Sequence, residues 1–304
     1  MLSFRSSRAR ATAISLATFL ALVSMAAAVS YSGGRPAQAA GDPVLVGAGD
    51  IASCSSSGDE ATAKLLDGIS GTVFTTGDNA YPDGTAAQFR DCYGPSWGRH
   101  KDRTRPSVGN HEYDTPGAAG YFDYFGTKAG PRGKGYYSYD RGEWHIVVLN
   151  SMCEKVGGCH EGSAQETWLK ADLAAHPNRC TLAYFHEPLF SSGSASSRVR
   201  PFWRALYRAN AEVVLGGHIH AYERFRPMEP DGDYNPSRGI REFVVGTGGA
   251  SHNRPFDTVA ANSVSRKTDA YGVLKLTLHA GSYEWKFVPV AGETFTDSGT
   301  ASCH

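Results

Sequence analysis

Short apolar segments alternate with amphipathic ones along the first two thirds of the chain. Val44–Val46 predicts a strand, Ser57–Ile69 carries apolar residues at helical spacing, and Thr72–Thr75 predicts a second strand. This strand–helix–strand order favours a βαβ unit in a largely parallel sheet. The same alternation returns in three later segments, with a strand at 181–185, a helix at 198–209 and a strand at 212–215.

Two other patterns complete the secondary-structure prediction. Residues 136–151 predict a hairpin that turns at Arg141-Gly142, and residues 163–175 predict a helix that Ser163 caps, with Glu166 completing a capping box. From residue 240 the pattern becomes β-rich, with strands expected at 242–245, 271–278 and 282–288. No internal repeat or low-complexity linker interrupts the chain, so one domain over residues 40–304 is the simplest interpretation.

The first 39 residues have the layout of a secretory signal peptide. A basic start with three arginines precedes an apolar stretch over residues 11–29, and residues 37–39 form a cleavage site of the A-x-A type. The alternative is an uncleaved membrane anchor, because about 19 apolar residues approach the length that spans a bilayer. We favour cleavage near Ala39 or Ala40, which predicts a secreted, extracellular protein without a stable membrane anchor.

The charge balance bears on the choice of partner. The first 39 residues hold four of the 30 basic residues and none of the 30 acidic ones, so the remaining chain carries a net charge of −4 with histidine neutral. A nucleic-acid partner requires a basic face. We therefore expect no nucleic-acid binding surface.

Six cysteines follow the predicted signal peptide: Cys54, Cys92, Cys153, Cys159, Cys180 and Cys303. An even number in an exported chain predicts three disulfides, and six cysteines allow fifteen pairings. Only Cys153–Cys159 is indicated by proximity, because Gly157-Gly158 lets the short loop close. A disulfide that holds the C-terminal segment would explain Cys303. Metal binding by thiolates is the weaker alternative, since no Cys-x-x-Cys pair is present.

Polar residues follow apolar strands at five places in the order Asp50, Asp78, Asn110-His111-Glu112, His186 and His218-Ile219-His220. The carboxyl ends of strands in an α/β sheet meet at one edge, where ligands bind, so these side chains can converge in space. Each motif alone is weak, because Gly-Asp and Gly-Asn are common turns. His218 and His220 would point the same way if the strand continued through them. The ordered set of five motifs is specific.

This ordered set resembles the calcineurin-like metallophosphoesterase superfamily and, within it, the purple acid phosphatase branch. The resemblance covers Asp50 to about His220 by motif, and more loosely the β-rich segment to about residue 290. It implies an α/β (α+β mixed) fold, a four-layer αββα sandwich of two mixed sheets with a dinuclear metal site at the C-terminal ends of the strands. The extra N-terminal β-domain of plant-type members is not expected here.

The resemblance also implies the ligands of two metal ions. The first ion would take Asp50, Asp78, Tyr81 and His220, and the second would take Asp78, Asn110, His186 and His218, with Asp78 as the bridge. Tyr81 stands three residues after Asp78, the spacing at which this branch supplies a tyrosine ligand; Ala52 stands where the branch has glycine. A phenolate favours a trivalent ion, so we expect Fe(III) at the Tyr81 site and Fe(II), Zn(II) or Mn(II) at the second site.

The implied reaction is hydrolysis of a phosphate monoester by attack of metal-bound hydroxide. His111 is expected to face the substrate as general acid or transition-state stabiliser, with a structural role as the alternative. Glu112 and Asp114 are candidate partners that orient it. Family members often carry a further histidine about ten residues after the position of His186, but serines fill residues 191–197 here. The preference for monoesters or diesters therefore stays open.

Three functions follow from these observations. The leading one is a metal-dependent phosphoric ester hydrolase, acid phosphatase-like, that takes small phosphate esters outside the cell. The alternative is a phosphodiesterase acting on nucleotide or lipid-derived diesters. A remote alternative is a non-catalytic, metal-dependent binding protein on the same scaffold, which is disfavoured because neither a ligand position nor His111 has been lost. Neither a Gly-x-Ser-x-Gly elbow nor a His-Glu-x-x-His motif is present.

Overall fold

The computed structural model describes residues 41–177, 180–252 and 254–304, so the predicted signal peptide lies outside the described residues. The described chain forms two mixed β-sheets. In spatial order, the first contains β13 (Ser298–Ser302), β12 (Ser282–Pro289), β11 (Gly272–His279), β1 (Val44–Ala48), β2 (Thr72–Thr76) and β3 (Thr104–Ser107). The second contains β10 (Ser263–Lys267), β8 (Tyr222–Phe225), β9 (Arg241–Val245), β7 (Val213–Gly216), β6 (Cys180–Tyr184), β5 (Trp144–Val148) and β4 (Tyr137–Arg141).

Each sheet has a parallel part and antiparallel strands beside it. Strands β1, β2 and β3 are parallel to one another, and so are β5, β6, β7 and β9. The predicted βαβ unit is confirmed as β1, α1 (Gly58–Gly68) and β2. Parallel strands bring their carboxyl ends to one edge, so this arrangement decides where the polar strand-end residues lie.

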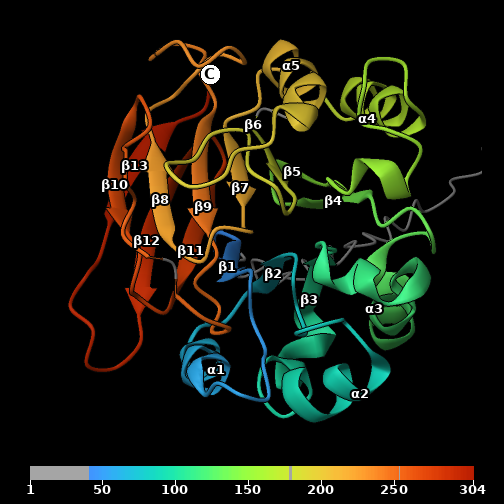
Figure 1. The fold of residues 1–304 in the computed structure, drawn as a ribbon. Coiled ribbons are helices and arrows are strands. Elements are labelled where there is room, and N and C mark those ends of the chain that lie inside the picture. Colours follow the sequence, from blue (N-terminus) through green and yellow to red (C-terminus); the bar gives the residue numbers. More distant parts are fainter. Residues whose placement is uncertain (1–40, 178–179, 253) are drawn as a thin grey trace, which may run out of the picture. The chain divides into compact units, whose positions relative to one another are not determined.

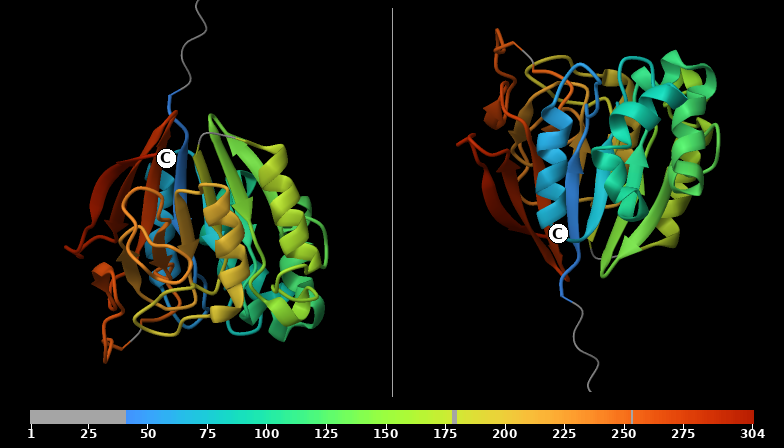
Figure 2. Two further views of the ribbon diagram at one scale, coloured as in Figure 1. Left: turned by 90° about the horizontal axis from the view of Figure 1, so that it is seen from above. Right: turned by 90° about the horizontal axis from the view of Figure 1, so that it is seen from below.

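The two sheets lie face to face and helices cover their outer sides (Figures 1 and 2). One apolar cluster fills the space between the sheets, where it contains Phe74, Leu182 and Val213, and continues on the other face of the first sheet with Val73. A second core lies between the other face of β5–β7 and the helices α4 (Ala164–Ala175) and α5 (Arg200–Arg208). On the opposite side the first sheet is covered by α1, together with the short helices α2 (Ala86–Gln88) and α3 (Ala119–Phe125) (Figure 1). The four-layer αββα sandwich is thus confirmed.

Local details differ from the sequence prediction in three places. The hairpin of β4 and β5 turns at Gly142-Glu143, one residue later than expected. Ser163 caps α4 by accepting a hydrogen bond from the backbone N–H of Glu166, but the Glu166 carboxylate accepts from Gly162, so the capping box is incomplete. Helix α5 begins at Arg200, after a 3₁₀ turn over Ser197–Val199.

Three disulfides join the cysteines of the described chain: Cys54–Cys92, Cys153–Cys159 and Cys180–Cys303. The pairing indicated by proximity, Cys153–Cys159, is among them. Cys180–Cys303 links the start of β6 to the residue after β13, and so ties the C-terminal segment to the second sheet. Among the described residues, no helix has both the length and the apolar character needed to cross a membrane.

Candidate metal centre

The structure brings the five polar motifs to one edge of the two sheets. Asp50, Asp78, His186 and His218 each lie two residues beyond the last residue of β1, β2, β6 and β7. Asn110 lies three residues beyond the end of β3. The centre therefore takes side chains from the parallel strands of both sheets, and it exists only when the sheets are packed together.

The backbone at three of these positions adopts a left-handed conformation. The φ angle is +58° at Asp50, +49° at Asp78 and +68° at His218. Residues other than glycine rarely adopt such angles, although Asp and His do so more readily than most. Backbone held in this region is common at functional sites, where the surrounding structure enforces it.

Glycines beside the polar residues let the strand-end loops approach one another closely. A Cβ at Gly77 would lie 2.6 Å from Nδ1 of His186, and one at Gly217 would lie 2.8 Å from Oδ2 of Asp50. A Cβ at Gly246 would lie 2.7 Å from the same Asp50 oxygen. The glycines of the Gly-Asp and Gly-Gly-His motifs therefore make room for donor side chains of neighbouring loops.

The first donor group consists of four atoms that lie close to one another. The hydroxyl of Tyr81 is 2.9 Å from Oδ1 of Asp50, 3.0 Å from Oδ2 of Asp78 and 3.0 Å from Nε2 of His220. Nε2 of His220 is 3.2 Å from Oδ1 of Asp50. These are the four residues expected to hold the first ion.

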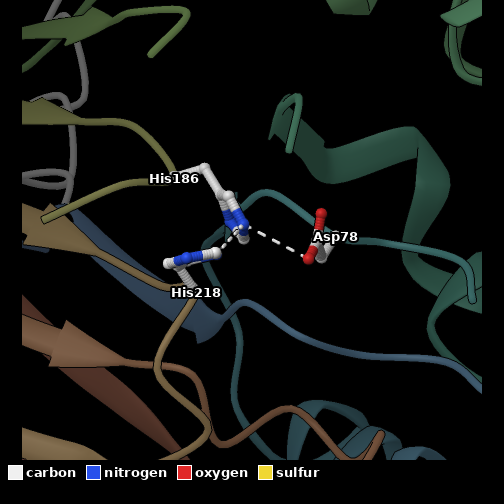
Figure 3. A group of neighbouring side chains, drawn as sticks. All are labelled: Asp78, His186 and His218. Atoms are coloured by element: carbon white, nitrogen blue, oxygen red, sulfur yellow. Dashed lines mark hydrogen bonds and ion pairs between the residues drawn. The ribbon is translucent and has the colours of Figure 1, made fainter. Parts of the chain in front are cut away.

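The second donor group includes Asp78, His186 and His218, which lie beside one another (Figure 3). Nε2 of His186 is 2.9 Å from Oδ1 of Asn110, 3.1 Å from Nδ1 of His218 and 3.2 Å from Oδ2 of Asp78. Nδ1 of His218 is 3.1 Å from Oδ1 of Asn110. These are the four residues expected to hold the second ion.

The same oxygen, Oδ2 of Asp78, belongs to both groups, as a bridging carboxylate requires. Neighbouring ligands of a transition-metal ion, each about 2.0–2.2 Å from the metal and at right angles, are about 3 Å apart. The donor separations of 2.9–3.2 Å match this spacing. Carboxylate, phenol, amide and imidazole donors also suit iron, zinc and manganese. The residues present fit two metal ions.

The buried donor groups shift one another's pKa values strongly. Burial opposes the ionisation of Asp78, but the neighbouring His186 outweighs it and lowers the pKa of Asp78 to about 2. Burial likewise disfavours the charged form of His186, but Asp78 raises its pKa to about 10. Burial and the two carboxylates beside it raise the pKa of Tyr81 well above its ordinary value. Ionising this phenol therefore requires a strong positive charge nearby.

Outer partners fix the orientation of the donor side chains. Nδ1 of His186 donates to the carbonyl of Thr76 at 2.8 Å, which leaves Nε2 with a free lone pair. Nδ1 of His220 lies 2.6 Å from Oγ of Ser251. Ser251 was not predicted, because it stands 31 residues beyond His220 and only the fold brings it there. The glycine-rich segment before it was the available signal.

His111 lies at the margin of the first donor group. Its ring packs against Tyr81 with 4.4 Å between ring centres, and Nε2 is 3.9 Å from Oδ2 of Asp78. Nδ1 is 2.5 Å from the carbonyl oxygen of Pro82 and 3.6 Å from Oδ2 of Asp114. Asp114 thus lies within reach of the ring.

The prediction that Glu112 orients His111 is wrong. Among the described residues no hydrogen bond joins the two side chains. The buried Glu112 carboxylate instead accepts four backbone N–H groups, from Asp78, Asn79, Ala80 and Gly109, at 2.6–3.3 Å. The helical turn that begins at His111 points the two side chains in different directions. Glu112 therefore braces the loop that carries Asp78.

Comparison with known proteins identifies the family of the chain. The chain belongs to the calcineurin-like phosphoesterase family, because the family model of that description matches residues 44–222, more than half of the chain. All eight donor and candidate catalytic positions lie inside the matched segment, from Asp50 to His220. Within the family the chain resembles the purple acid phosphatase branch.

Curated relatives carry phosphatase names. Purple acid phosphatase 23 of Arabidopsis thaliana is 31% identical over 170 residues, which cover 48% of this chain and 35% of the relative. The phosphoenolpyruvate phosphatase of Allium cepa is 29% identical over 179 residues, 50% of this chain and 36% of the relative. The chain thus spans about a third of the length of these relatives.

Solved structures show the same fold. The purple acid phosphatase PPD1 from yellow lupin superimposes with a TM-score of 0.67 at 22% identity, over 86% of this chain and 53% of that chain. GAP50 of Plasmodium, described as the anchor in the inner membrane complex, gives the same TM-score at 12% identity, over 87% and 90%. The purple acid phosphatase family implies a dinuclear metal site, and the two donor groups are candidates for it.

Proposed function

We propose that this protein is a secreted, two-metal phosphatase that hydrolyses small phosphate monoesters. The observation that carries the proposal is the shared oxygen of Asp78, which lies 3.0 Å from the Tyr81 hydroxyl and 3.2 Å from Nε2 of His186. Two donor groups of four residues each meet at this oxygen. An ion pair network for stability alone does not need an amide oxygen and a phenol in the same cluster.

The proposed ligands of the first ion are Asp50, Asp78, Tyr81 and His220, and those of the second are Asp78, Asn110, His186 and His218. Two cations bound there would neutralise the negative charge of the phosphoryl oxygens. They would also lower the pKa of a bound water molecule, so that hydroxide would be available at neutral pH. The chain itself supplies the rigidity of the centre. Glu112 fixes the backbone of the Asp78 loop, and Thr76 and Ser251 orient the rings of His186 and His220.

His111 is the proposed proton donor to the leaving alcohol. The Pro82 carbonyl can only accept, so Nδ1 carries a hydrogen and Nε2 is the nitrogen turned toward Asp78. The side chain is about one-third exposed, so a substrate can reach it. In its doubly protonated form, a ring held in this way keeps its Nδ1 hydrogen on Pro82 and can give its Nε2 proton to an alkoxide that leaves near the shared Asp78 oxygen.

The donor chemistry supports a choice of metal pair. The Tyr81 hydroxyl lies between the carboxylates of Asp50 and Asp78, where only a highly charged cation would stabilise a third negative charge. We therefore assign Fe(III) to the Tyr81 group and Fe(II), Zn(II) or Mn(II) to the group with Asn110.

Secretion rests on two features that support each other. Residues 1–39 carry the signal-peptide pattern, and we propose cleavage near Ala39 or Ala40. Every cysteine of the described chain is in a disulfide, which suits an oxidising compartment. Expression with residues 1–39 in a secreting host, followed by N-terminal sequencing of the protein in the medium, tests both the cleavage site and the location.

The activity is tested on secreted protein by metal analysis, visible spectroscopy and hydrolysis of p-nitrophenyl phosphate and bis-p-nitrophenyl phosphate. We expect two metal ions per chain, a phenolate-to-iron absorption that Tyr81→Phe removes, and a preference for the monoester. Tyr113→Phe is the matched control, because Tyr113 lies in the same region and bonds only to Asn150 among the described residues; it should keep the absorption. His111→Ala should lower kcat about 100-fold with both metals retained.

The other outcomes decide between the alternatives. Two divalent ions without the absorption, together with a preference for the diester, would favour the phosphodiesterase. Absence of both metal binding and turnover in the disulfide-bonded protein would overturn the proposed function.

A further inference from the structure

Two loops that follow neighbouring parallel strands extend past the metal centre. The loop after β5 contains the disulfide Cys153–Cys159, and the loop after β6 runs from His186 through a serine-rich segment to α5. The backbone N–H of Glu187 donates to Oγ of Ser151 at 3.0 Å, so the two loops are joined at their base. Loops at the carboxyl ends of parallel strands are where α/β proteins bind their substrates.

A polar cavity begins at the second donor group. Its volume is about 290 Å³, and its walls include His218, Glu187, Ser194, Ser196, Ser197 and Arg198. His218 is one of the proposed ligands, so a phosphate ester bound at the metal centre can extend its alcohol part directly into this cavity. The serine hydroxyl groups and the Arg198 guanidinium that line this cavity can hydrogen bond to polar groups of that alcohol.

A larger and mostly apolar cavity continues from the first. Its volume is about 500 Å³, and Ser197 and Arg198 line both cavities. The remaining walls include the disulfide, Gly157, Gly158 and Pro201. Arg198 forms an ion pair with Glu154 of the opposite loop, at the place where the two cavities meet. The lining thus changes from polar to apolar with distance from the metal centre.

The walls are held in place by buried contacts. The buried carboxylate of Glu242 accepts the backbone N–H groups of Leu189 and Phe190 at 3.0 and 2.9 Å. Glu223, also buried, accepts the backbone N–H of Ser192 at 2.8 Å. The opposite loop is closed by its disulfide. A preformed groove loses less conformational entropy on binding than a flexible one, so it can select among ligands.

We propose that the two cavities form one groove for the alcohol part of the substrate. The groove favours extended phosphate monoesters whose alcohol carries hydroxyl groups next to the phosphate and an apolar group further out. A nucleoside monophosphate and an acylglycerol phosphate share this chemistry. The inference rests on the proposed phosphatase function, since it assumes that the phosphate lies at the two donor groups.

Binding of non-hydrolysable phosphonates to the metal-loaded protein, measured by titration calorimetry, tests the groove. One pair compares the analogue of adenosine 5′-phosphate with that of ribose 5-phosphate, and the other compares the analogue of an acylglycerol phosphate with that of glycerol 3-phosphate. At least one extended ligand should bind about tenfold more tightly than its short partner, as expected for about 60 Å² of newly buried apolar surface. The pair that shows the gain identifies the source.

Ser197→Trp fills the junction of the two cavities. It should reduce the gain in affinity of the extended ligand over its short partner to within about twofold. Pro201→Trp blocks the apolar cavity from α5 and provides a second, independent variant if the first folds poorly. Ala174→Trp is the matched control, since Ala174 is exposed on α4 and lines neither cavity; it should keep the full gain.

Equal binding of long and short ligands by the wild type would overturn the groove, and so would a gain that persists in both blocked variants. Hydrolysis of p-nitrophenyl phosphate is measured on the same samples. A gain that the blocked variants remove, without any turnover of that ester, would leave the groove in place and overturn the phosphatase proposal alone.

Discussion

Gly109 lies directly against the carboxylate of Asp78. A Cβ at residue 109 would come within 2.2 Å of Oδ1 and 2.4 Å of the backbone nitrogen of Asp78. Asp78 is buried, and its other oxygen belongs to both donor groups. The glycine of the Gly-Asn-His motif is therefore required by the position of the bridging carboxylate rather than by a turn.

Gly109→Ala should displace Asp78 and weaken metal binding at both sites. We expect a loss in affinity of at least 10- to 100-fold, as for the removal of a group that supports a ligand. Metal titration of the variant checks this. Gly68→Ala is the matched control, because a Cβ there meets no atom within 4 Å and alanine favours the helix by up to about 1 kcal/mol. Tight binding of two ions by Gly109→Ala would contradict the assignment of Asp78 as the bridge.

Glu112 accepts four backbone N–H groups of the loops that carry Asp78 and Asn110. Glu112→Gln keeps the shape but turns an NH₂ group toward N–H donors, so we expect a loss of about 2–4 kcal/mol in the free energy of unfolding. Urea unfolding of the metal-free protein measures it. Glu143→Gln, at the exposed turn between β4 and β5, should change this free energy by less than about 0.5 kcal/mol. Equal stability of the two variants would show that Glu112 does not brace the loop.

The parallel parts of both sheets could be predicted from the sequence, because their strands are short apolar runs next to amphipathic helices. Three strands could not: β8, β10 and β13. Strand β10 reads Ser-Val-Ser-Arg-Lys and β13 reads Ser-Gly-Thr-Ala-Ser, and both are edge strands with half-exposed or exposed residues. An edge strand has little apolar surface to bury, so its hydrogen-bonded partner defines it rather than its own pattern.

The donor residues could be named from the order of the motifs, but the way they meet could not. The expectation that His218 and His220 point the same way along a continuing strand is wrong, because β7 ends at Gly216 and His218 is left-handed. The turn sends His218 to the Asn110 group and His220 to the Tyr81 group. Such turns arise from contacts between loops that are distant in sequence, so no local pattern reveals them.

His145 is buried between two carboxylates near the start of β5. Nδ1 is 2.8 Å from Oδ1 of Asp140 on β4, Nε2 is 2.9 Å from Oδ2 of Asp172 on α4, and the ring stacks on His176 with 4.5 Å between centres. Burial disfavours the imidazolium, but the two carboxylates outweigh it and raise the pKa of His145 above its ordinary 6.5. Burial also opposes the ionisation of Asp172, yet His145 and Ser138 lower its pKa below the ordinary 3.8.

This network should make the stability depend on pH. The contribution of His145 is fully present below pH 6.5 and is lost as the pH rises through its raised pKa; that of Asp172 is present above pH 3.8 and is lost as the pH falls through its lowered pKa. His145→Asn should therefore lower the free energy of unfolding most, by roughly 2 kcal/mol, between pH 3.8 and pH 6.5. The loss should become progressively smaller above pH 6.5. Urea unfolding at a series of pH values checks it.

The exposed His160 provides the control for this series, because its ring bonds only to a backbone carbonyl among the described contacts. His160→Gln should change the free energy of unfolding by less than about 0.5 kcal/mol at each pH of the series. A cost of His145→Asn that does not change between pH 6 and 9 would show that His145 is neutral in the folded protein.

The disulfides Cys180–Cys303 and Cys153–Cys159 should have opposite effects on stability and ligand binding. The first closes a separation of 123 residues and the second only 6, so loop-closure entropy predicts that the first stabilises the fold more, by roughly 2–3 kcal/mol. Cys180 begins β6, at the end of the strand opposite the metal centre. We expect Cys180→Ala/Cys303→Ala to lower the free energy of urea unfolding strongly while metal binding at 25 °C is retained.

Cys153→Ala/Cys159→Ala should lose little stability but should lose the preference for extended phosphonates, because this disulfide lines the apolar cavity. Equal losses of stability in the two double variants would contradict the loop-closure argument, and an intact preference in the second would contradict the groove.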